Sequence, residues 1–75
     1  MALDNMELFS SRLQALREKR GIKRAVASEF CGFASNAFRR YERGEMEPSA
    51  RALQIMAEEF GVSMDYLWGN EENFR

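Results

Sequence analysis

The sequence predicts a single domain of the all-α class, spanning residues 1–75. A chain of 75 residues is too short to support two separate cores. β-Branched and aromatic residues do not alternate with polar ones, as they do along a half-buried strand. Apolar residues instead recur at helical spacing, in segments that end at glycines. We therefore expect a compact five-helix bundle, with an ordered core at residues 5–69 and a frayed polar tail at residues 70–75.

Capping residues and apolar spacing define the first two helices. Asp4 or Asn5 can cap a first helix, and Gly21 is a natural stop for it. The apolar side of this helix consists of Met6, Phe9, Leu13 and Leu16. A second helix is expected at about residues 23–31, with Gly32 in the turn that follows it. The residues that this helix offers to the interior are Ala27, Phe30 and Cys31.

A third helix is expected from about Ser35 to Arg43, before Gly44, and its two faces differ in chemistry. Its polar arc consists of Ser35, Asn36, Arg39, Arg40 and Arg43. Its apolar arc consists of Ala34, Ala37, Phe38 and Tyr41. Such a helix can pack its back on a small core while its cationic front, with amide and hydroxyl groups, enters a DNA groove.

Two further helices complete the predicted fold. Pro48 disfavours helix in the residue before it, and Ser49 can cap a fourth helix that ends at Gly61. The apolar stripe of this helix consists of Ala50, Leu53, Met56, Ala57 and Phe60. A final short helix opens at Ser63 and ends at Gly69.

Composition restricts the chemistry of the chain. One cysteine, Cys31, and no histidine exclude an internal disulfide and leave no recognisable zinc ligand set. We interpret Cys31 as a small buried apolar group. No apolar run approaches the roughly 20 residues that span a bilayer, and the N-terminus lacks the features of a signal peptide. We expect a soluble, cytoplasmic protein with no metal, no cofactor and no enzymatic activity.

The charges are segregated along the chain, although the net charge is only −1. Residues 12–43 carry nine Lys and Arg residues and three Glu residues. Residues 44–75 carry two Arg residues and seven acidic residues. Because one part of the molecule is cationic and the rest anionic, the domain can orient over a polyanion despite its low isoelectric point.

Several short strings between residues 9 and 69 occur at the spacing of a known family. They are Phe9, Arg12, Leu13, Leu16 and Arg17 before Gly21-Ile22, then Gly32, Arg40-Tyr41-Glu42-Arg43-Gly44, Glu47-Pro48-Ser49, Gly61-Val62-Ser63 and Asp65-Tyr66-Leu67. In this set the chain resembles the lambda-repressor-like, Cro/cI-type helix-turn-helix domains of phage and bacterial repressors. The resemblance implies their five-helix fold, with the helix-turn-helix at residues 23–43.

The resemblance also implies a function and a set of binding residues. It implies a sequence-specific transcriptional regulator, a repressor of phage, prophage or plasmid type, that binds a near-palindromic double-stranded DNA operator. The base-reading positions of the family fall on Ser35, Asn36, Arg39 and Arg40. One phosphate-contacting position, usually a Gln in the family, falls on Arg24, with Lys23 before it, and another falls on Arg43, so Lys23, Arg24 and Arg43 are the expected phosphate contacts. The family's pairing of an arginine with a glutamate implies a structural bridge between Arg17 and Glu42.

Besides Arg24, the chain departs from the family pattern at four positions. Ser28 replaces the usual Ala of the second helix, and Ala27 replaces the large aliphatic residue before it. Phe38 replaces an Ile or Val of the third helix, so we expect a compensated exchange in which a large residue faces a small one. Ala34 replaces the usual capping Ser, so Ser35 is a candidate cap in its place.

Other interpretations of these residues stay open. The arginines of the third helix can form a solvated face, and Ser35 and Asn36 can act as caps only. Ile55, Tyr66 and Trp68 can form a patch that pairs two copies into a homodimer, or Trp68 can fold back and cover Ile55. The same surface supports an alternative function, an antitoxin or protein-interaction module with DNA binding secondary or lost.

Overall fold

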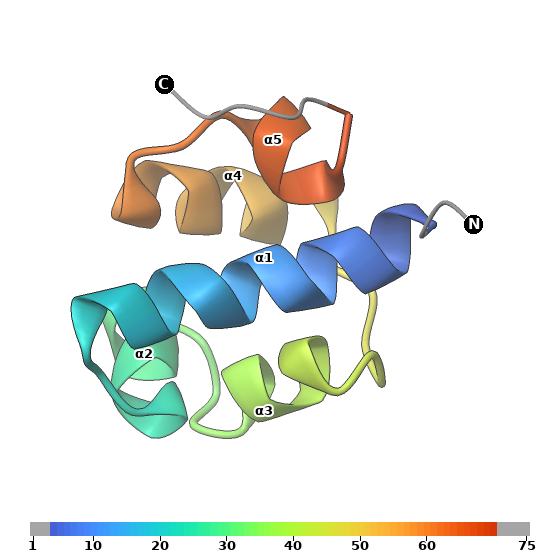
Figure 1. Cartoon of the computed structure of the whole chain (residues 1–75). Helices are drawn as coiled ribbons and strands as arrows, with labels where there is room; N and C mark the ends of the chain where they lie inside the picture. Colours follow the sequence, from blue (N-terminus) through green and yellow to red (C-terminus); the bar gives the residue numbers. More distant parts are fainter. Residues whose placement is uncertain (1–3, 71–75) are drawn as a thin grey trace.

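A computed structural model describes residues 4–70 and contains only α-helices among them, as the all-α prediction requires (Figure 1). The five helices are α1 (Asn5–Arg20), α2 (Arg24–Phe30), α3 (Ala37–Glu42), α4 (Ala50–Phe60) and α5 (Met64–Trp68). The number of helices is as predicted. Most of the predicted polar tail, residues 71–75, lies outside the described residues.

The longest helix, α1, is the element against which the others are arranged. Figure 1 shows α2 and α3 on one side of α1 and α4 and α5 on the other. Its start is a capping box, in which Asp4 accepts a hydrogen bond from the Glu7 N–H at 2.8 Å and Glu7 accepts one from the Asp4 N–H at 3.2 Å. Its end is Gly21, whose φ of 74° is accessible to glycine at little cost. Both ends of α1 are therefore encoded locally.

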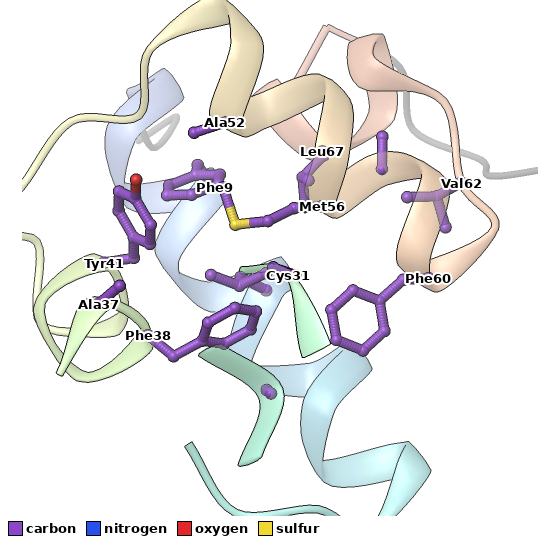
Figure 2. Packing of buried hydrophobic residues seen from close by; sticks show 13 residues of the cluster. Phe9, Cys31, Ala37, Phe38, Tyr41, Ala52, Met56, Phe60, Val62 and Leu67 are labelled. Atoms are coloured by element: carbon purple, nitrogen blue, oxygen red, sulfur yellow. The ribbon is translucent and has the colours of Figure 1, made fainter. Parts of the chain in front are cut away.

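Aromatic side chains join the two sides of α1 into one core. Phe9, fully buried, lies edge-on to Tyr41 of α3 with ring centroids 5.6 Å apart, and 6.0 Å from Trp68 of α5. Phe38 of α3 lies 6.1 Å from Phe60 of α4. Figure 2 shows the rings of Phe9, Phe38, Tyr41 and Phe60 within one cluster. The packing of α3 is thus continuous with that of α4 and α5.

The buried face of α2 differs from the prediction. Phe30 was expected in the interior but is 57% exposed, whereas Ser28 is fully buried. Ala27 and Cys31 are buried as expected. On a helical projection these three buried residues share one arc, and Phe30 lies about 100° from its middle. Helix α2 therefore contributes the hydroxyl of Ser28 to the interior, and not the aromatic ring of Phe30 that the sequence suggested.

The apolar stripe of α4 is also shifted. Ala50, the first residue of the helix, is exposed, and Ala52 is buried in its place. Met56, Ala57 and Phe60 are buried as predicted. Ala50 directly follows the cap Ser49, so it lies at the end of the helix where the core no longer covers it.

A mostly buried ion pair ties α1 to α3. Arg17 donates to Glu42 through Nε at 2.7 Å and through a terminal nitrogen at 3.1 Å. The two side chains are 12% and 3% exposed. The hydrogen bond to Glu42 raises the pKa of Arg17 above its ordinary value, and this effect outweighs the opposing effect of burial. The bridge expected from the family pattern is therefore present, in bidentate form.

Removal of one partner of this pair should destabilise the domain strongly. We expect Glu42→Gln to lower the free energy of unfolding by about 3–5 kcal/mol, because Arg17 then keeps its charge in a mostly buried position with only the longer contact to the exposed Glu18, at 3.8 Å, to offset it. Urea denaturation followed by far-ultraviolet circular dichroism measures the change.

Glu59→Gln is the matched control, because it breaks an exposed pair with Arg20 whose charged atoms are 3.1 Å apart. That substitution should cost at most about 1 kcal/mol. Similar losses for the two variants would contradict a special role for the buried pair.

Cys31 is a buried thiol that is kept neutral. Burial raises the pKa of Cys31 to about 11, with a smaller contribution from the charge of Glu59. At pH 8 roughly one such thiol in a thousand is ionised in the folded chain. In the unfolded chain, where the pKa is near 8.5, about a quarter of the thiols are ionised. The neutral thiol therefore acts as a small apolar group of the core.

We expect an aromatic disulfide reagent at pH 8 to label the folded chain about a hundredfold more slowly than the unfolded chain.

The raised pKa of Cys31 also makes the free energy of unfolding depend on pH. The stability that depends on the neutral thiol is fully present below about pH 8.5 and declines as the pH rises towards 11. Cys31→Ala lacks this decline, so parallel pH profiles for the two chains would contradict the assignment.

Candidate nucleic-acid interface

The polar and apolar sides of α3 are separated as the helical projection predicts. Ala37, Phe38 and Tyr41 are buried in the core. The four side chains predicted to read bases are all exposed on the other side of this segment: Ser35, Asn36, Arg39 and Arg40. One short segment thus carries both the attachment to the core and a surface of hydroxyl, amide and guanidinium groups.

The start of α3 differs from the prediction by two residues. The helix begins at Ala37, and Ser35 and Asn36 belong to the turn before it. Asn36 takes the capping position, but neither its side chain nor that of Ser35 forms a hydrogen bond within residues 4–70. Ala34, predicted on the apolar arc, is exposed, and its carbonyl closes the turn before α3 by accepting from the Ala37 N–H at 3.0 Å. The proposal that Ser35 caps the helix is therefore wrong.

Hydroxyl groups from two other helices hold α3 at its ends. Ser28 of α2 accepts a hydrogen bond from the Phe38 N–H at 2.9 Å, in the first turn of α3. Ser10 of α1 donates to the Tyr41 carbonyl at 2.6 Å, in the last turn. The sequence analysis did not assign either role. The one available signal was Ser28 itself, a polar residue at a position where the family usually has Ala.

The predicted phosphate contacts lie at the ends of the helix-turn-helix. Lys23 is the capping residue of α2 and Arg24 is its first residue, and both are exposed. Arg43 caps the C-terminal end of α3 and is also exposed. Its Nε lies 3.1 Å from a carboxylate oxygen of Glu45, so this cation is already paired within the chain.

Within the basic segment, residues 12–43, other cationic side chains form contacts inside the domain. Arg20 pairs with Glu59 at 3.1 Å and lies over the Phe60 ring, 4.7 Å from its centroid. Arg12 lies over the Tyr66 ring at 4.3 Å and donates to the Tyr66 carbonyl at 2.5 Å. The positive charge available to a ligand is therefore more concentrated on α2 and α3 than the sequence count indicates.

The possible pairing surface is only partly exposed. Ile55, Tyr66 and Trp68 are each half-buried and pack against the core. Tyr66 is engaged by Arg12, and Trp68 lies against Phe9 of α1. The side chain of Trp68 thus packs against α1.

Among residues 4–70, no set of three or more carboxylate, thiol or imidazole side chains is grouped as metal ligands would be. None of the helices in this part of the chain combines the length and the hydrophobicity of a membrane span.

Comparison with known proteins gives a consistent result. A family model described as helix-turn-helix matches residues 13–67, most of the chain. Repressor protein C2 of Salmonella phage P22 is 32% identical over 63 residues, which cover 84% of this chain and 29% of that protein. The prophage-derived HTH-type transcriptional regulator YonR of Bacillus subtilis is 30% identical over 60 residues, which cover 80% of this chain and 56% of the relative.

The likeness extends to three dimensions. A crystal structure of the P22 c2 repressor in complex with a synthetic operator has a TM-score of 0.79 and 30% identity to this chain. The superposition covers 85% of this chain and 97% of that one. The chain spans only between 29% and 56% of the length of the two curated relatives. From the match over residues 13–67 and the five-helix architecture, we conclude that the chain belongs to the Cro/cI-type, lambda-repressor-like helix-turn-helix family.

Proposed function

We propose that the chain is a sequence-specific DNA-binding transcriptional regulator, of repressor type, that reads the major groove with α3. The observation that carries the proposal is the joint exposure of Ser35 and Asn36, in the turn before α3, and of Arg39 and Arg40 on α3 itself, whose other side is packed into the core. A firmly held helix with free polar groups is what direct readout of base edges requires.

The chemistry of these groups suggests a division of roles. The amide of Asn36 can form paired hydrogen bonds with an adenine edge, and an arginine can grip guanine through two donors. Lys23, Arg24 and Arg43 would contact phosphates and hold the register of the protein on the duplex. Repression then follows from occupation of the operator by the domain.

The relatives support this proposal. The P22 c2 repressor was crystallised with a synthetic operator, and YonR is named as a transcriptional regulator. Because this chain spans at most 56% of those two relatives, the activity of their whole length is transferred here only as a proposal. We propose binding without catalysis, and a cytoplasmic location because bacterial DNA lies there.

A near-palindromic operator requires two copies of the chain, since each copy has one α3. We propose that the copies meet through the exposed parts of Ile55, Tyr66 and Trp68, with the second α3 entering the next major groove. This arrangement predicts two chains on each operator duplex.

Base-reading and phosphate-contacting residues should give different signatures. We expect Asn36→Ala with Arg40→Ala to abolish the preference for the selected operator over a scrambled duplex, because the donors to base edges are gone. We expect Arg24→Gln to weaken binding to both duplexes alike and to reduce the slope of log affinity against log salt by about 0.9. Fluorescence anisotropy over a range of salt concentrations measures both effects.

The duplex for these titrations is the one that the wild-type chain selects from random oligonucleotides. Glu58→Gln is a suitable control, because Glu58 is exposed on α4, away from α3. Failure of the wild-type chain to bind any duplex at low salt would refute DNA binding and leave the protein-interaction module as the better hypothesis.

The pair between Arg43 and Glu45 should reduce DNA affinity. Since Glu45 competes with phosphate for Arg43, we expect Glu45→Gln to tighten binding about 1.5- to 5-fold, on operator and scrambled duplexes alike. The gain should diminish as salt rises.

Glu47→Gln removes the same charge from the same loop, at an exposed position, whereas the ion pair of Arg43 within residues 4–70 is with Glu45. It should tighten binding less than Glu45→Gln does. Equal gains would mean that only net charge matters and that the pair has no effect of its own.

A further inference from the structure

The hydroxyl of Ser28 connects the two helices of the proposed DNA-binding surface. Its oxygen donates a hydrogen bond to the Arg24 carbonyl at 2.9 Å and accepts one from the Phe38 N–H at 2.9 Å. Because a carbonyl can only accept and an N–H can only donate, both directions are determined. The side chain is fully buried, so water does not compete for these bonds.

Within the described chain, α3 is capped differently from α1, α4 and α5. Those three helices each begin at a residue whose own side chain accepts from the first turn, namely Asp4, Ser49 and Ser63. The residue at the start of α3, Asn36, makes no such bond. The first-turn N–H of Phe38 is bonded instead to Ser28, ten residues earlier in the chain.

Capping from α2 leaves the Asn36 amide available. A capping Asn directs its side chain back to the backbone of its own helix, and that geometry withdraws the amide from an external partner. In this chain Ser35 and Asn36 are both exposed, and their side chains form no hydrogen bond within residues 4–70. The Ser28 hydroxyl therefore accepts the first-turn hydrogen bond of α3 that the side chain of a base-reading residue would otherwise have to accept.

The other bond of the hydroxyl reaches the start of α2. Arg24 is the first residue of α2 and a proposed phosphate contact, and its carbonyl accepts from Ser28. The backbone carbonyl of Ser28 also accepts from the Phe33 N–H at 2.9 Å, which fixes the turn between the helices. One residue thus links the phosphate-contacting end of α2, the turn and the first turn of α3.

We propose that Ser28 is a positioning residue for base recognition, resting on the DNA-binding function proposed above. Its hydroxyl sets the height and tilt of the first turn of α3 relative to α2 and leaves the Asn36 amide free for DNA. Loss of the hydroxyl changes the pose of Asn36 relative to the phosphate contacts and reduces discrimination between bases. Contacts to phosphate, which tolerate small shifts, remain.

The test compares Ser28→Ala with Ser49→Ala in the full chain. Ser49→Ala is the matched control, because it removes a hydroxyl that accepts from a helix N–H at 3.0 Å at the start of α4. Circular dichroism and thermal midpoints report stability, and backbone amide exchange at Phe38 and Ala52 reports each lost bond. Anisotropy titrations on the selected operator and on a scrambled duplex report the discrimination ratio.

We expect Ser28→Ala to lower the discrimination ratio by about tenfold, the equivalent of roughly one base contact, with binding to the scrambled duplex unchanged. Ser49→Ala should keep the ratio, even where its thermal midpoint falls as far. If Ser28→Ala does not fold, Ser28→Cys replaces it, since the cysteine side chain has the same branching as serine, fills the site with a somewhat larger atom and is only a weak acceptor.

Two results would overturn the positioning role. One is an unchanged ratio in Ser28→Ala although amide exchange at Phe38 has accelerated. The other is an equal fall of the ratio in both variants, which would reduce Ser28 to a contribution to stability. A wild-type chain that prefers no duplex would overturn the DNA-binding function and this inference together, whereas the first two results leave the function intact.

Discussion

The attachment of α3 to the rest of the domain is the constraint on which the structure depends. A helix of six residues is not stable by itself, because nucleation costs more than its few hydrogen bonds return. The stability of α3 comes from outside: Phe38 and Tyr41 fill the core, Glu42 pairs with Arg17, and hydroxyls from α1 and α2 bind its two ends. The helix is in effect a rigid extension of α1 and α2.

This form of attachment explains how so short an element can present free polar groups. Every anchor of α3 uses its inner side or its backbone, so its outer side chains are not needed for stability. The internal contacts are also complete, since no buried side-chain nitrogen or oxygen among the described residues lacks a hydrogen-bond partner. The exposed side chains of α3 do not stabilise the fold, so they can be selected for binding a ligand without destabilising the domain.

The fold also refines the charge argument. Nine cations lie in the basic segment, but Arg12, Arg17 and Arg20 are engaged with Tyr66, Glu42 and Glu59. The remaining positive charge is concentrated around α2 and α3, on the opposite side of α1 from α4 and α5, which carry Glu58, Glu59 and Asp65 against Arg51 (Figure 1). The low net charge is thus compatible with a local excess of positive charge around α2 and α3, which suits orientation over a polyanion.

The sequence by itself determined the features that depend on near neighbours. The caps at Asp4, Ser49 and Ser63, the glycine stops and the two-faced character of α3 were predictable, because their partners lie within one or two turns. Only the tertiary structure decided the start of α3 at Ala37, the exposure of Phe30 and the use of the Ser10 and Ser28 hydroxyls. Those hydroxyls bind groups 31 and 10 residues away in the chain, and no local pattern encodes such a partner.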